Sequence, residues 1–135
     1  MTATAPSASV EVRVPFHDVD ALGVVWHGHF YKYFELARTA LMQSRGLDVN
    51  DMAALGVRVV VVESRCRYLR PLRYDDRCAV TATLGEVTPR VVVRYAIRLA
   101  DGAHVARGHT TLVALGPDGA MLPEVPDEIL SRLTR

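Results

Sequence analysis

The sequence predicts an α+β domain in which an antiparallel sheet of about five strands wraps around one long central helix. Residues 29–45 form one helical pattern without proline, with apolar residues at spacings of three and four. Beyond residue 56 the chain is strand-like, with runs of valine and apolar–polar alternation broken by short turn sequences. Strands joined by tight turns are antiparallel, so a parallel sheet is excluded. The predicted order is strand, long helix, short helix, four strands and a final short helix.

The long helix is predicted to be buried on more than one side. One face carries the apolar residues Phe30, Tyr33, Phe34, Ala37, Ala40 and Leu41. Leu36 and Met42 add apolar surface elsewhere, and Gly46 is placed to stop the helix in a left-handed cap. Asp48 can cap a short second helix at residues 49–55, which Gly56 ends.

The strands are expected at residues 10–15, 57–69, 78–87, 91–100 and 104–115. Asp101 and Gly102 are a hairpin signal between the last two. Pro126 is expected in the first turn of the terminal helix, which runs to about residue 133. Residues 1–9 are rich in Ala, Thr, Ser and Pro and are expected to be a flexible N-terminus before a single domain at residues 10–135.

Composition narrows the class of protein. A formal net charge of +1 over 135 residues argues against a general nucleic-acid binder. Cys66 and Cys78 are far apart, so we interpret them as reduced thiols packed on strands. The N-terminus lacks the pattern of a secretory signal, and no apolar run approaches the ~20 residues that a membrane span needs. We expect a cytoplasmic protein without a membrane span.

Four polar residues that can carry chemistry precede the long helix: Asp18, Asp20, His27 and His29. A helix N-terminus has free backbone N–H groups and a partial positive charge. A reactive group placed there can therefore act beside a site that stabilises an oxyanion.

The motif D-x-D-A-x-G-V-V-W-H-x-x-F-x-x-x-F-E-x-A-R, which begins at Asp18, resembles that of the hotdog-fold thioesterases. The resemblance is to the 4-hydroxybenzoyl-CoA thioesterase family and its relatives among the short acyl-CoA thioesterases of the Tol–Pal gene cluster. It extends over about residues 10–133. It implies a hotdog fold, hydrolysis of acyl-CoA to free acid and CoA, and assembly as a homodimer or tetramer. No cofactor is expected. A metal site of Asp20, His27 and His29 is disfavoured, because side chains at i and i+2 of a helix start converge poorly.

The same resemblance implies roles for individual residues. Asp20 falls on the family's catalytic carboxylate, which acts as nucleophile or as general base, and the sequence does not choose between these. His27 falls on the position whose backbone N–H polarises the thioester carbonyl. Gly23, Val24 and His29 are expected to contact substrate. Arg90 matches the last residue of a basic cluster that grips the nucleotide of CoA.

Three departures from the benzoyl-CoA branch leave the acyl group open. Ala21 follows the catalytic position where that enzyme has proline, Leu22 replaces a small residue, and His29 stands where many relatives have asparagine. We interpret Asp18 as a residue that orients the turn. The His27 imidazole either contacts substrate or Asp20, or is satisfied by a carbonyl.

The basic residues can also be explained by structural roles rather than functional ones. Glu35 and Arg38, one turn apart, are expected to form a helical ion pair. Arg65, Arg67, Arg70 and Arg73 either help to bind CoA phosphates or form a solvated strand face. Rival functions are a thioesterase acting on carrier-protein thioesters, a non-catalytic acyl-CoA-binding domain and a hotdog dehydratase.

Assembly is predicted from the valine-rich strand at residues 57–69. An exposed edge of that kind is an aggregation hazard unless it is paired. In hotdog proteins the corresponding edge pairs with its twofold mate, which implies at least a dimer whose active sites use both chains.

Overall fold

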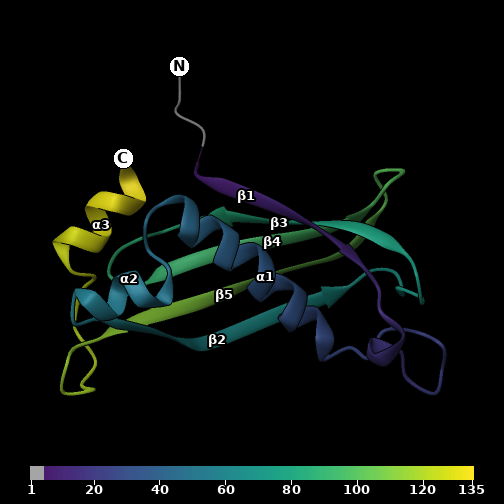
Figure 1. Cartoon of the computed structure of the whole chain (residues 1–135), viewed down its shortest axis with the longest axis horizontal. Helices are drawn as coiled ribbons and strands as arrows, with labels where there is room; N and C mark the ends of the chain where they lie inside the picture. Colours follow the sequence, from purple (N-terminus) through teal and green to yellow (C-terminus); the bar gives the residue numbers. More distant parts are fainter. Residues whose placement is uncertain (1–4) are drawn as a thin grey trace.

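The computed structural model describes residues 5–135 and confirms the predicted α+β class (Figure 1). An antiparallel sheet of five strands, in the order β1-β3-β4-β5-β2, curves around one long helix. The strands are β1 (Ser7–Arg13), β2 (Arg58–Tyr68), β3 (Arg77–Leu84), β4 (Val91–Leu99) and β5 (His104–Leu115). The helices are α1 (His29–Ser44), α2 (Val49–Ala54) and α3 (Asp127–Thr134), and a single 3-10 turn, η1 (Phe16–Asp18), follows β1.

Helix α1 is buried along the predicted face. Its buried residues are Phe30, Tyr33, Phe34, Ala37, Leu41 and Met42. The Phe34 ring stacks on Tyr95 of β4 with the ring centroids 4.4 Å apart. Gly108 of β5 permits this close packing, since a Cβ there would lie 2.7 Å from the Phe34 ring. Gly46 (φ +67°) follows the helix in the left-handed conformation, as predicted.

The strands present alternate faces to α1 and to solvent. In β3 the residues Cys78, Val80, Ala82 and Leu84 are buried. Cys66 and Cys78 are free thiols on β2 and β3, as predicted, and burial raises the pKa of the Cys78 thiol to about 11. Gly108, which faces Phe34, pairs with Cys66. The neighbours of this pair, Arg65 and Arg107, therefore project from the opposite face of the sheet.

Several predicted boundaries were wrong. Strand β1 begins at Ser7 rather than residue 10, because residues 7–13 all pair with β3 and the Ser9 and Thr81 hydroxyls are 2.6 Å apart. Residues 1–4 of the predicted flexible segment lie outside the described residues. Strand β3 ends at Leu84, where the chain turns toward β4. Pro126 is the N-cap of α3 rather than part of its first turn.

Strand β2 lies at one edge of the sheet and pairs only with β5 among the strands of residues 5–135. Its valines Val60, Val61 and Val62 are 38%, 43% and 46% exposed. This edge is therefore both apolar and open within a single chain. No helix in the described part of the chain is long and apolar enough to cross a membrane.

Candidate active site

The residues before α1 form a small hairpin that leads from η1 into the helix. Val19 and Val25 form an antiparallel bridge. The Asp20 N–H donates to the Val24 carbonyl at 2.9 Å, and the Trp26 N–H donates to the Asp18 carbonyl at 3.1 Å. These bonds hold Asp20 and the N-terminus of α1 on one short, closed segment.

Asp20 sits at the turn of this hairpin and is partly exposed. One carboxylate oxygen, Oδ1, accepts a hydrogen bond from the Leu22 N–H at 2.8 Å. The turn closes through the Gly23 N–H, which donates to the Asp20 carbonyl at 3.0 Å, and Gly23 adopts φ +80°. Within residues 5–135 the second oxygen, Oδ2, accepts no hydrogen bond. The carboxylate is thus oriented through one oxygen and unengaged at the other.

His27 lies one residue before the N-cap of α1 and is exposed. Its carbonyl accepts a hydrogen bond from the Tyr68 hydroxyl at 3.0 Å. Its backbone N–H donates to no group of the described chain. A free N–H at the start of a sixteen-residue helix is suited to bind an oxyanion. The imidazole contacts the rings of Trp26 and Tyr68.

A cavity of about 300 Å³ opens beside this N–H. Its lining residues are mostly apolar: Val24, Val25, His27, Phe30, Tyr68, Leu69, Arg70 and Pro71. Val24 and His27, both predicted site residues, therefore border the same space. Tyr68 was missed by the sequence analysis, since only the tertiary structure brings the end of β2 to the start of α1.

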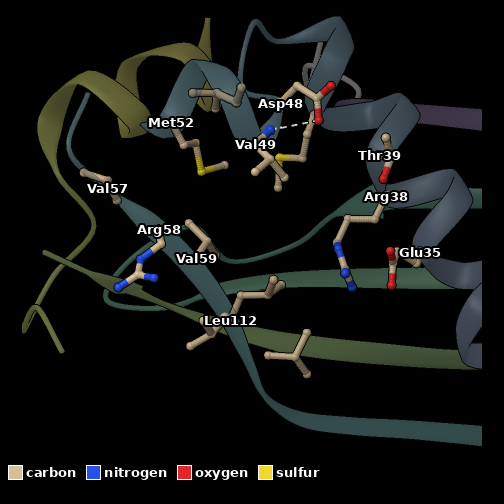
Figure 2. A pocket seen from close by; sticks show the side chains of 14 residues that line it. Glu35, Arg38, Thr39, Asp48, Val49, Met52, Val57, Arg58, Val59 and Leu112 are labelled. Carbon is tan, nitrogen blue, oxygen red and sulfur yellow. Dashed lines mark hydrogen bonds between the residues drawn. The ribbon is translucent and has the colours of Figure 1, made fainter. Parts of the chain in front are cut away.

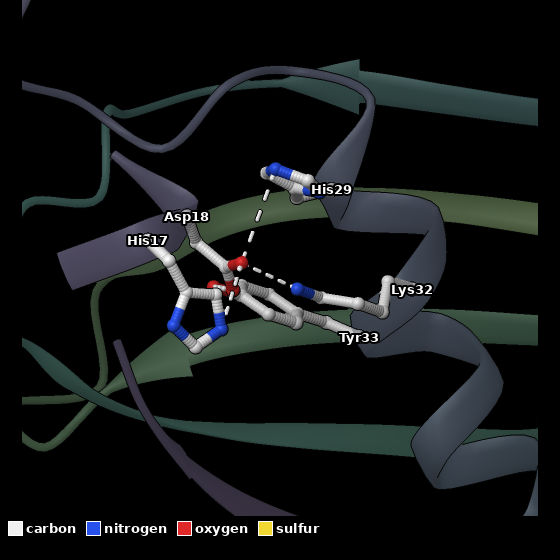
Figure 3. A network of polar contacts seen from close by, with 5 residues as sticks. All are labelled: His17, Asp18, His29, Lys32 and Tyr33. Atoms are coloured by element: carbon white, nitrogen blue, oxygen red, sulfur yellow. Dashed lines mark hydrogen bonds and ion pairs between the residues drawn. The ribbon is translucent and has the colours of Figure 1, made fainter. Parts of the chain in front are cut away.

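Asp18, two residues before Asp20, is the centre of a buried polar network (Figure 3). Its side chain is only 1% exposed. Oδ1 accepts from Lys32 Nζ at 2.5 Å, and Oδ2 accepts from the Tyr33 hydroxyl at 2.7 Å. The Nε2 atoms of His17 and His29 lie 3.7 and 3.9 Å from Oδ1.

The electrostatics of Asp18 favour its charged form. Burial alone raises the pKa of this carboxyl, but the hydrogen bonds from Lys32 and Tyr33 and the charges of Lys32 and His29 outweigh it and hold the pKa below its ordinary value. Burial and the hydrogen bond to Asp18 raise the pKa of Tyr33. The network ties the hairpin to the first turns of α1, which agrees with the prediction that Asp18 orients the turn.

The network includes two residues that the sequence analysis did not single out. Tyr33 was assigned only to the apolar face of α1, although a buried tyrosine hydroxyl needs a partner. Lys32 directly precedes Tyr33 in the sequence, and its place on α1 brings its side chain over the hairpin. His29 packs between Asp18 and the Trp26 ring, and its contact with substrate stays a prediction.

A second cavity, of about 280 Å³, lies between the C-terminal half of α1, α2 and the first half of β2 (Figure 2). Arg38 and Glu35 project into it, and Met42, Met52, Val59 and Leu112 supply apolar walls. Arg38 donates to the Tyr95 hydroxyl at 3.2 Å and forms no ion pair with Glu35. The predicted helical pair is therefore wrong, because the tertiary packing of α1 on β4 offers Arg38 another acceptor.

The predicted basic residues are not brought to one place. Arg90 directly precedes Val91, which pairs with Leu112, whereas Tyr68 beside His27 pairs with Ala106. Leu112 and Ala106 are six positions apart on β5, which corresponds to about 20 Å. Arg90 thus lies at the opposite end of the sheet from His27 of the same chain. Arg65 and Arg67 project from the outer face of β2, and Arg70 borders the cavity beside His27.

No group of three or more His, Cys, Asp or Glu side chains within residues 5–135 is arranged to hold a metal ion. His27 and His29 both contact the Trp26 ring, but His27 otherwise contacts Tyr68 while His29 faces Asp18.

Comparisons with known proteins agree with the motif and the fold. A family model described as the thioesterase-like superfamily matches residues 14–133. A putative esterase of Aquifex aeolicus is 31% identical over 121 residues, which cover 90% of this chain and 93% of the relative. The acyl-CoA thioester hydrolase YbgC of Escherichia coli is 35% identical over 65 residues, 48% of each chain.

The solved structure of a 4-hydroxybenzoyl CoA thioesterase mutant complexed with 4-hydroxybenzoyl CoA shares the fold, with a TM-score of 0.85. It is 20% identical and covers 96% of this chain and 100% of that one. The hotdog fold predicted from the motif is confirmed.

Proposed function

Because the chain belongs to the thioesterase-like superfamily, we propose that it hydrolyses acyl-CoA thioesters to a free acid and CoA. Asp20 supplies the attacking carboxylate or the general base, and the backbone N–H of His27 stabilises the oxyanion. Gly23 and Val24 shape the turn and wall that receive the thioester. The acyl-CoA thioester hydrolase name of one relative supports the choice of substrate class.

Two routes satisfy this arrangement. In the first, an Asp20 oxygen attacks the thioester carbon, the C–S bond breaks, and the CoA sulfur leaves and takes a proton from water. A second water then hydrolyses the resulting anhydride and restores the carboxylate. In the second route, Asp20 accepts a proton from a water whose oxygen attacks the same carbon; the C–S bond then breaks and the CoA sulfur leaves with that proton. Negative charge develops on the carbonyl oxygen in both, where a fixed N–H donor lowers the barrier.

The observation that carries the proposal is the pairing of two unengaged groups on one hairpin. Asp20 keeps one oxygen free while the Leu22 N–H holds the other. The His27 N–H is unpaired within the described residues, and its own carbonyl is held by Tyr68. Both groups are positioned by the same short segment, so they are preorganised without a ligand.

The test is release of CoA thiol from a panel of aliphatic and aromatic acyl-CoA substrates. Asp20→Asn keeps the turn acceptor but removes the base, and should lower kcat by roughly 10²- to 10⁴-fold. Asp118→Asn is the matched control, because Asp118 also accepts the N–H two residues ahead, at Ala120, but lies beyond β5. Activity of Asp20→Asn within tenfold of wild type would contradict the assignment. Binding without turnover of any thioester would support a non-catalytic acyl-CoA-binding domain.

We further propose that two chains pair through β2. The exposed valines of this edge favour a partner strand, and a second copy supplies one by antiparallel pairing. A twofold axis then places the Tyr68 end of one β2 beside the Arg58 end of the other. Arg90 and the cavity in Figure 2, both from the second chain, then lie near the His27 site of the first. There Arg90 can bind the nucleotide and the cavity can receive the acyl group.

Light scattering checks the assembly directly, and a monomer at micromolar concentration would contradict it. A mixing experiment checks the shared site. Arg90→Ala should raise KM for acyl-CoA with little change in kcat, because a phosphate contact is equal in ground and transition states. When Arg90→Ala chains are co-assembled with Asp20→Asn chains, the mixed dimer regains one intact site and a wild-type KM. Persistence of the raised KM would show that Arg90 does not act across the dimer.

A further inference from the structure

The outer face of the sheet, opposite α1, carries a concentration of arginines that hydrolysis does not require. Register places Arg65, His109 and Arg94 in one row across β2, β5 and β4, and Arg67 beside Arg107 in the next. Arg98 pairs with His104 in the row beyond. We call the exposed residues Arg65, Arg67, Arg94, Arg98 and Arg107 the arginine face.

Little of this charge is neutralised within the chain. Arg94 lies 3.3 Å from Glu86, and Glu63 lies 3.1 Å from the His109 ring. For the other four arginines, residues 5–135 place no carboxylate oxygen within 4.0 Å. The chain has a formal net charge of only +1, whereas the five arginines of this face have Glu63, Glu86 and, in the row of Arg98, Glu11 as acidic neighbours on the same side of the sheet.

His104 lies within the positive electrostatic field of these arginines. Its ring lies 3.2 Å from an Arg107 nitrogen. Burial lowers the pKa of this imidazole, and the charges of Arg107 and Arg98 lower it further. The positive residues at this end of the sheet are therefore close enough to act on a common neighbour.

The shape of the face favours a macromolecule over a small anion. Ala96 stands between Arg94 and Arg98 on β4, and the small side chains Ala79, Thr81 and Thr83 flank them on β3, on the convex outer side of the sheet. A small ligand is bound in a concave pocket with converging donors, and neither of the two cavities described above includes a residue of the arginine face. Spaced guanidinium groups on an open, convex surface complement the carboxylates of an acidic protein.

The face also begins at the end of the sheet where the active site opens. Arg67 directly precedes Tyr68, whose hydroxyl binds the His27 carbonyl on the other side of the sheet. Leu69, Arg70 and Pro71 then line the cavity beside His27. A flexible thioester arm attached to a protein on the arginine face has only to pass around this strand end.

We propose that the arginine face docks an acidic carrier protein that delivers the acyl thioester on a phosphopantetheine arm. The inference rests on the proposed thioesterase function and names a second carrier for the same acyl group. The reaction is unchanged: water adds to the acyl carbon, the C–S bond breaks, and the arm leaves as a free thiol. The surface selects the carrier, and Asp20 and His27 perform the chemistry.

The test compares one acyl group on CoA and on an acidic acyl carrier protein, with wild type and Arg98→Glu/Arg107→Glu. The double variant reverses two charges of the face, and kcat/KM for the carrier substrate should fall at least about tenfold, mainly through KM. Hydrolysis of acyl-CoA should stay within about twofold, which also shows that the variant is folded. Arg135→Glu is the control for reversing the charge of an exposed arginine, because it lies off the face.

In wild type, added salt should reduce kcat/KM for the carrier substrate more steeply than for acyl-CoA. Carrier hydrolysis that is insensitive to both the charge reversal and salt would overturn the inference, as would random-sequence DNA competing as well as the acyl-free carrier. Hydrolysis of acyl-CoA under those outcomes leaves the proposed function intact. Failure to hydrolyse either thioester would instead contradict the proposed function itself.

Discussion

Asp18 and Asp20 lie on the same hairpin, two residues apart, in opposite surroundings. Asp18 is buried, with both carboxylate oxygens engaged by Lys32 and Tyr33. Asp20 is partly exposed, with one oxygen bonded to a backbone N–H two residues ahead. The first carboxylate connects the hairpin to α1, whereas the second has an oxygen available to a ligand.

This difference gives the two carboxylates different roles: Asp18 supports the local structure, whereas Asp20 can take part in the reaction. A buried charge that is fully hydrogen-bonded holds its surroundings in one arrangement but has no capacity left for a substrate. A reactive carboxylate needs a free oxygen and a fixed orientation. The two aspartates divide these tasks, so their substitution should affect different properties of the protein.

The largest expected effect of this comparison on stability comes from Asp18→Ala. The variant leaves the Tyr33 hydroxyl buried without a partner and removes an ion pair with the half-exposed Lys32, which should lower the free energy of unfolding by roughly 2 to 4 kcal/mol. Asp20→Ala should change it by less than about 1 kcal/mol while abolishing hydrolysis. Urea denaturation measures both, and equal losses would remove the distinction between the two residues.

An intermediate effect is expected for Tyr33→Phe. The ring is retained, so packing in the core is preserved, but Asp18 Oδ2 loses its donor. Hydrogen bonds to charged groups contribute roughly 1.5 to 3 kcal/mol, and the same denaturation experiment should show a loss of that size. Tyr31→Phe is a suitable control, because Tyr31 is also on α1 but contacts Phe34 rather than Asp18. A loss below about 0.5 kcal/mol for Tyr33→Phe would indicate that the network is weak.

The smallest expected effect is in the pH dependence of stability. The pKa of Asp18 is lowered in the folded protein, so its contribution is present above the pKa of the unfolded chain, near 3.8, and is lost as pH falls through the folded value. The stability advantage of wild type over Asp18→Asn should therefore shrink as the pH falls below about 5 toward the lowered folded pKa. In a Lys32→Met background this loss should weaken, since Lys32 supplies part of the lowering. If wild type instead became more stable relative to Asp18→Asn as the pH falls, the pKa of Asp18 would not be lowered in the folded protein.

Local patterns in the sequence determined the elements and several of their ends. The spacing of Phe30, Phe34, Ala37 and Leu41 predicted the buried face of α1, because helical periodicity is independent of what covers the helix. Asp48 caps α2 and Gly46 ends α1 for equally local reasons. The start of β1 at Ser7 was missed because small polar residues resemble a flexible tail until a partner strand pairs with them.

The tertiary structure decided which of these residues meet. Two aspartates in one short motif are chemically equivalent on paper, and only packing against Lys32 and Tyr33 makes one of them buried. Strand order places β2 at an open edge, moves Arg90 to the far end of the sheet and gathers Arg67 and Arg107 on its outer face. Residue type and periodicity are properties of the chain, whereas proximity between distant residues depends on how the strands are ordered and paired.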